Sequence, residues 1–180
     1  MFDRKLNRLE GFDYSQSGYY FVTICAKDRT HWFGQVLNGK MILNECGKIV
    51  KKQWEWLGNQ YDTVSIGEHC VMPNHFHGII GINVGNGRDR SLQPNDHPPR
   101  NIKPLPELIG AFKTTSSKLI HLAGLPEFQW HKSYYDHIIR DESSMNKIRE
   151  YICNNALNWE SDSENENPVD DMSLTGIGSQ

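Results

Sequence analysis

The middle of the chain carries two strand-like runs separated only by Pro73-Asn74, and this pair limits the possible folds more than any other feature. Residues 61–72 and 75–84 are rich in β-branched, aliphatic and aromatic side chains, and Pro-Asn is typical of a turn. Strands joined by so short a connection pair in antiparallel fashion. We therefore expect an antiparallel sheet built around this pair.

The flanking segments carry further strand and helix patterns. Residues 18–26 are aromatic and β-branched, which predicts a first strand, and Asn38-Gly39 suits the turn of a small hairpin. Asn44 can cap a helix, and Gly124 fits the end of another. The expected elements are a strand at 18–26, a hairpin at 33–36 and 41–43, a helix from 44 to about 58, a helix at 105–122, a strand at 128–139, and a helix at 143–159 capped by Asp141 or Ser143.

This order of elements predicts an α+β fold. Two helices alternate with four strands, and the two middle strands are adjacent in sequence, as in a ferredoxin-like or RRM-like sandwich. The sheet is expected to be antiparallel with helices packed on one face, the other face free for a ligand, and a further helix at the C-terminal end. We expect one domain over residues 1–159, a long loop at 85–104, and a disordered acidic tail at 160–180.

Charge and composition allow nucleic acid as a partner without requiring it. The net charge is −3, but the last 21 residues hold six acidic and no basic side chains, so residues 1–159 carry a mild positive excess. No apolar run approaches the roughly 20 residues that cross a bilayer, and no secretory signal is visible. We expect a cytoplasmic protein without a membrane partner, with its four cysteines reduced.

The sharpest local motif is His75-Phe76-His77. Side chains alternate along a strand, so both imidazoles project to one face while Phe76 points to the other. Two neighbouring imidazoles form half of a divalent metal site. Taken alone, such a pair is more often two polar residues on the solvent face of a strand.

The expected C-terminal helix carries Tyr151 and Asn155. Residues four apart lie one above the other on a helix, so the phenol and the amide share a face. Ile148 and Ile152 are expected to hold that helix against the sheet, which would present both polar groups to the histidines. An ordinary amphipathic packing contact is the alternative interpretation of Tyr151.

The chain resembles the REP-associated tyrosine transposases, relatives of the small single-strand insertion-sequence transposases in the HUH endonuclease superfamily. The resemblance covers about residues 4–159, and its motifs occur in family order. One departure is visible, because Asn155 is followed by Ala156 where members commonly have proline. The matching pieces are RKLNRL at 4–9, the run 14–26, VMPNHFH at 71–77, Phe112-Lys113, Trp130, YYDHIIRDE at 134–142, and YICNN at 151–155.

The resemblance implies a metal-dependent enzyme that cleaves and joins single-stranded DNA, with hairpin-forming repeats as the expected target. His75 and His77, with Asn155 as a possible third ligand, would hold Mg²⁺ or Mn²⁺, and the metal would polarise the scissile phosphate. Tyr151 would attack the phosphorus and form a 5′-phosphotyrosine intermediate. Relatives in the wider group act as dimers, so a monomer and a homodimer both stay open.

Other functions and other residues also stay open. A non-catalytic single-stranded nucleic-acid-binding module would use the same open sheet face, and a metal-dependent hydrolase would activate water instead of Tyr151. Tyr134 and Tyr135 are rival nucleophiles, of which at most one can face the metal because neighbours on a strand point in opposite directions. Phosphate contacts are expected from Arg4, Lys5, Arg8, Lys113 and Lys118.

Overall fold

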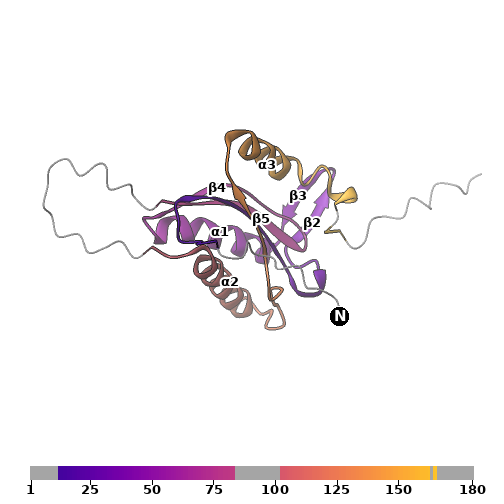
Figure 1. Cartoon of the computed structure of the whole chain (residues 1–180). Coiled ribbons are helices and arrows are strands. Elements are labelled where there is room, and N and C mark those ends of the chain that lie inside the picture. Colours follow the sequence, from indigo (N-terminus) through magenta and orange to yellow (C-terminus); the bar gives the residue numbers. More distant parts are fainter. Residues whose placement is uncertain (1–11, 84–101, 163, 166–180) are drawn as a thin grey trace, which may run out of the picture.

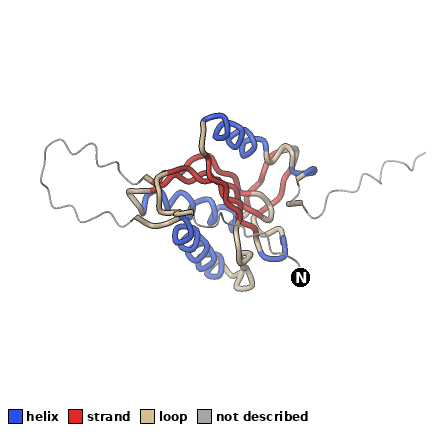
Figure 2. The backbone as a smooth tube through the Cα atoms, viewed as in Figure 1, coloured by secondary structure: helices blue, strands red, loops and turns tan. Residues whose placement is uncertain are grey.

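The computed structural model describes residues 12–83, 102–162 and 164–165. Its main feature is a four-stranded antiparallel sheet in the order β4-β5-β1-β6 (Figures 1 and 2). The strands of this sheet are β1 (Gly18–Cys25), β4 (Val64–Val71), β5 (His75–Ile82) and β6 (Tyr135–Ile139). A separate hairpin is formed by β2 (Gly34–Leu37) and β3 (Lys40–Leu43).

The sheet lies between helices on both sides. Helices α1 (Glu45–Gln60) and α2 (Leu105–Leu122) cover one face, and α3 (Glu142–Asn154) crosses the other (Figure 1). The order of the strands and of the first two helices is that of a ferredoxin-like sandwich, so the predicted fold class is confirmed. The face that we expected to be free is partly covered by α3, which contacts β4 and β6.

The core lies between the sheet and helices α1 and α2. Along β1, alternate side chains point into it, and Tyr20, Val22 and Ile24 are fully buried. On β5, Phe76 packs against Trp54 of α1 and Phe112 of α2, with ring centroids 4.7 and 5.3 Å away. The anchoring of Phe76 in this core fixes the direction of its neighbours His75 and His77, which must point to the α3 side.

Local signals in the sequence set several element boundaries. The side chain of Asn44 accepts a hydrogen bond from the backbone N–H of Gly47 at 3.0 Å and begins α1. Asn38 and Gly39 adopt φ of 50° and 69°, the left-handed pair that a tight hairpin turn requires. Asp141 caps α3 by accepting from the backbone N–H of Ser144 at 2.8 Å.

Two predicted elements are shorter than expected. The last strand begins only at Tyr135, because His131, Lys132 and Ser133 are all exposed and interrupt the alternation that a strand needs; Trp130 forms only an isolated bridge with Ala26. Helix α3 ends at Asn154, and a 3-10 turn, η2 (Trp159–Ser161), follows after a short break. Among the described residues past 159, where the sequence predicted a disordered tail, Asp162 bonds to Asn155 and Glu164 pairs with Arg29.

Some predictions fall outside the described residues. These are the basic side chains Arg4, Lys5 and Arg8, residues 85–101 of the predicted loop, and the end of the acidic tail at 166–180. None of the helices in the described part of the chain combines the length and the apolar character needed to span a membrane.

Candidate metal and tyrosine site

His75 and His77 lie side by side on β5, on the face that α3 crosses. Their ring centroids are 4.5 Å apart, and both side chains are buried. On the central strand β1, Cys25 is paired with His75 and Thr23 with His77. The two imidazoles thus lie on one face of the sheet, as strand alternation predicted.

Neighbouring side chains orient both imidazoles. The Nδ1 atom of His75 lies 2.8 Å from Oδ1 of Asn74, and the amide nitrogen of Asn74 donates to the backbone oxygen of Glu164 at 2.8 Å. This second bond fixes Asn74 Oδ1 as the acceptor, so His75 carries its proton on Nδ1. Nδ1 of His77 lies 2.8 Å from the hydroxyl of Thr23. Both rings therefore turn Nε2 toward the space beneath α3.

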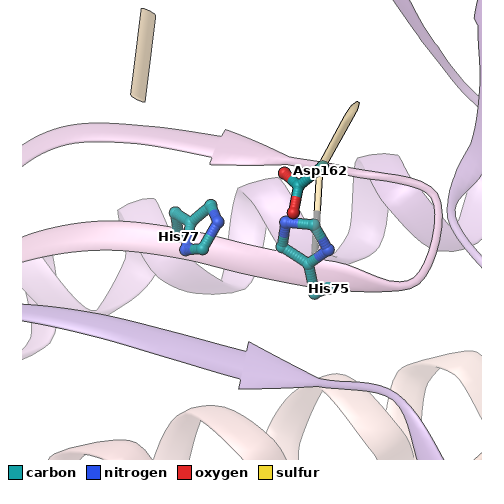
Figure 3. A group of neighbouring side chains, drawn as sticks. All are labelled: His75, His77 and Asp162. Carbon is teal, nitrogen blue, oxygen red and sulfur yellow. The ribbon is translucent and has the colours of Figure 1, made fainter. Parts of the chain in front are cut away.

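A carboxylate and an amide complete the cluster. Asp162 brings an oxygen close to the two histidines, so that one atom from each of the three side chains lies within 4.8 Å of the others (Figure 3). The amide nitrogen of Asn155 donates to Asp162 Oδ2 at 3.1 Å. Among the described residues, two buried atoms of this cluster have no hydrogen-bond partner, Nε2 of His75 and Oδ1 of Asn155. Two orphaned lone pairs beside a carboxylate are the chemistry of a cation site.

Burial keeps both histidines neutral. Loss of solvent and, after it, the nearby Arg29 charge lower the pKa of His75 to about 3, while the Asn155 side chain opposes the shift. Burial, followed by the neighbouring His75, holds the pKa of His77 well below its usual value. A neutral imidazole has a free lone pair, so protons do not compete with a metal ion at neutral pH.

Tyr151 projects from α3 onto the histidines. Its hydroxyl lies 3.2 Å from Nε2 of His77, and its ring meets Phe21 edge-on at a centroid distance of 6.1 Å. The side chain remains 44% exposed, so the hydroxyl is reachable from solvent. Burial of its inner part, followed by the charge of Asp162, raises the pKa of Tyr151 to about 12. Without a bound cation the phenol therefore stays protonated.

The C-terminal segment, residues 159–162 and 164–165, folds back over the site. The Trp159 ring lies 5.9 Å from that of His75. Glu164 forms an ion pair with Arg29 and accepts from the Cys25 thiol at 3.3 Å. The segment thereby carries Asp162 to the histidines. Sequence reasoning missed Asp162 because it lies in a stretch that is acidic and poor in apolar residues; the lone Trp159 was the available signal that this stretch packs.

The predicted lysines of α2 lie away from this cluster. Lys113 and Lys118 line an open groove of about 730 Å³ between α2 and residues 128–132. The ammonium of Lys113 donates to the backbone oxygens of His131 and Lys132, at 2.7 and 3.2 Å. Of the rival tyrosines, Tyr134 is buried and Tyr135 is exposed.

Comparison with known proteins shows which proteins the chain is similar to. No protein-family model matches it. A solved structure of a REP-associated tyrosine transposase bound to a REP hairpin superposes with a TM-score of 0.53 at 16% identity, over 84% of this chain and 72% of that one. The chain thus has the fold of the REP-associated tyrosine transposases, as the resemblance predicted. It belongs to one family with a Haemophilus influenzae protein described as uncharacterized, which is 35% identical over 164 residues, or 88% of this chain and 91% of that protein.

Proposed function

We propose that the protein is a metal-dependent enzyme that cleaves single-stranded DNA and transfers the strand through a covalent phosphotyrosine. The observation that carries this proposal is the 3.2 Å approach of the Tyr151 hydroxyl to Nε2 of His77, within one chain and beside a cluster suited to a cation. A structural relative bound to a REP hairpin supports hairpin-forming DNA as the target.

His75, His77 and Asp162, with the amide oxygen of Asn155, are the groups proposed to hold Mg²⁺ or Mn²⁺. Two imidazoles favour Mn²⁺ over Mg²⁺, and oxygen ligands suit either. A divalent cation held there withdraws charge from the oxygens of a bound phosphate. Thr23 and Asn74 keep the imidazoles turned toward this position, so the ligand geometry exists before the metal binds.

In the proposed reaction the phenolic oxygen of Tyr151 attacks the scissile phosphorus. A P–O bond forms to the tyrosine, the bond to the 3′ oxygen breaks, and that oxygen leaves as a 3′-hydroxyl after taking up a proton. The phenolic proton can pass to water, because Tyr151 is 44% exposed. Attack by a free 3′-hydroxyl on the phosphotyrosine reverses these changes and joins a strand without a nucleotide cofactor.

A trapping experiment tests the nucleophile. Wild type, Tyr151→Phe and Tyr19→Phe are incubated with Mn²⁺ and a labelled hairpin oligonucleotide with single-stranded flanks, and protein-DNA adducts are resolved on a denaturing gel. Tyr19 is 46% exposed on the same face of the sheet and serves as the matched control. We expect adducts with wild type and Tyr19→Phe, and none with Tyr151→Phe or with EDTA. Equal adduct from Tyr151→Phe would contradict the assignment.

The basic groove at α2 is proposed to hold the DNA backbone. Lys113, Lys118 and Lys132 line it without an acidic neighbour among the lining residues. Lys118 is exposed and is the better target for mutation, since Lys113 also donates to backbone oxygens. Lys118→Ala should weaken DNA binding and lower the slope of log K against log salt by about 1. An unchanged salt dependence would mean that the DNA backbone binds elsewhere on the protein.

A further inference from the structure

Beside the tyrosine site, the α3 face of the sheet carries a short aromatic platform made of Phe21, which is partly buried, and Tyr135, which is exposed. On β1, Thr23 is paired with His77 on one side and with Tyr135 on the other, so these three side chains form a row across the same face. Phe21 is two residues from Thr23 on β1 and is thus a diagonal neighbour of Tyr135, at about 7–8 Å. The platform is continuous with the histidines.

The two rings differ in what already covers them. One face of Phe21 stacks on His77 at a centroid distance of 5.3 Å, which holds its ring in place. Tyr135 is 53% exposed at the start of the edge strand β6, whereas its neighbours Tyr134 and Asp136, which point to the opposite face, are buried. A large aromatic side chain left open beside a candidate active site is a surface for a planar ligand.

The surroundings favour an anionic strand. Lys132 lies three residues before Tyr135 and is exposed, and its positive charge at this end of β6 attracts phosphate. Neighbouring strands are about 4.8 Å apart, so Tyr135 lies about 10 Å from His77, two strands away. That span suits a nucleotide whose phosphate lies near the histidines and whose base reaches across Thr23.

We propose that Tyr135, supported by Phe21, stacks the base of a nucleotide flanking the scissile phosphate of single-stranded DNA. This inference rests on the proposed function, since it takes the position of the phosphate from it. Stacking on a sheet platform is tolerant of sequence, because every base offers a π-face. Tyr135 would then position the strand without taking part in bond making.

Binding in the absence of cleavage tests the inference. All variants are made on Tyr151→Phe and measured with EDTA, by fluorescence anisotropy, against a thymidine oligonucleotide and an abasic strand of equal length. The abasic strand keeps the phosphates and lacks the bases. Tyr135→Ala should weaken binding of the oligonucleotide by about 5-fold to 150-fold and leave binding of the abasic strand within about twofold. Tyr135→Phe should restore most of the lost affinity.

The outcomes separate the two proposals. Leu119→Ala, an exposed apolar side chain on α2 at the other side of the sheet, is the control for loss of surface area. If Tyr135→Ala weakens binding of the oligonucleotide and of the abasic DNA equally, or weakens neither, the stacking role is refuted. This holds whether or not wild type forms adducts. If wild type forms no adduct while Tyr135→Ala selectively loses the base-bearing strand, the platform stands and the catalytic proposal fails.

Discussion

Replacement of Thr23 by valine isolates the orientation of His77. The Thr23 hydroxyl lies 2.8 Å from Nδ1 of His77, and both side chains are buried. Valine has nearly the same shape and suits a strand, so Thr23→Val removes the hydrogen bond and little else. Thr23→Ser keeps the hydroxyl and is the matched control.

Two effects of known size should follow from Thr23→Val. Loss of the partner that orients a metal-binding histidine typically lowers metal affinity 10-fold to 100-fold, or about 1.4 to 2.7 kcal/mol. In the metal-free protein, a buried Nδ1 without a partner costs about 1–3 kcal/mol of unfolding free energy. For a chain of this length that cost corresponds to roughly 2 to 12 °C in Tm.

Isothermal titration with Mn²⁺ and thermal unfolding with EDTA measure these two quantities. We expect Thr23→Val to lose both affinity and Tm, and Thr23→Ser to retain most of each. If Thr23→Val bound Mn²⁺ as tightly as wild type while its Tm fell, His77 would not be a ligand through Nε2. If neither quantity changed, the contact between Thr23 and His77 would carry no energy and the reasoning on orientation would be wrong.

Four other changes have defined outcomes. Asp162→Asn should weaken Mn²⁺ binding at least tenfold in calorimetry and lower the pKa of Tyr151 in an ultraviolet titration, because the carboxylate charge raises that pKa. Both histidines have lower pKa values in the folded than in the unfolded protein, so the free energy of unfolding should be highest above about pH 6.5. It should fall as the pH drops, by up to about 2 kcal/mol for each histidine at pH 5, as measured by urea unfolding with EDTA. Gly78→Ala should lower Tm, because the new Cβ would lie 2.7 Å from the buried indole of Trp54. The control Gly110→Ala meets nothing within 4 Å and should raise the free energy of unfolding by about 0.5–1 kcal/mol. Mixing Tyr151→Phe with His77→Ala should yield no DNA adduct, because the hydroxyl of Tyr151 lies 3.2 Å from His77 of its own chain.

The parts of the fold that sequence predicted well depend on local chemistry. Asn44 and the Asn38-Gly39 turn act within a few residues of themselves, so their roles can be inferred without tertiary context. The bounds of α2 follow from its apolar spacing and from Gly124, which adopts φ of 97° at its end. The direction of His75 and His77 follows from strand alternation about a buried Phe76, again a local rule.

The parts that were missed depend on contacts between distant residues. Asp162 reaches the site because Trp159 packs near His75 and Glu164 binds Arg29. Neither contact is predicted by a local sequence pattern. Composition alone predicted disorder there, since acidic segments with few apolar residues rarely pack. Phe128 and Trp130 likewise enter the core, but the exposed residues 131–133 separate them from β6, so the last strand begins later than predicted.

The connection between β6 and α3 explains why the tyrosine meets the histidines of its own chain. Only Arg140 and Asp141 separate β6 from α3, so the helix must begin at the edge of the sheet where β6 lies. From Glu142 to Tyr151 a helix rises about 13 Å, and crossing from β6 over β1 to β5 requires about 10 Å.

Helix α3 is therefore long enough to cross those strands at a slant and deliver Tyr151 above His77, with Asn155 one turn further toward His75. Ile152, buried against Ile79 of β5 and Ile139 of β6, holds the helix at that angle. A longer connection after β6 would let α3 swing away from its own sheet, and the tyrosine could then serve a partner chain. The two-residue link, capped by Asp141, removes that freedom and ties the position of Tyr151 to the fold itself.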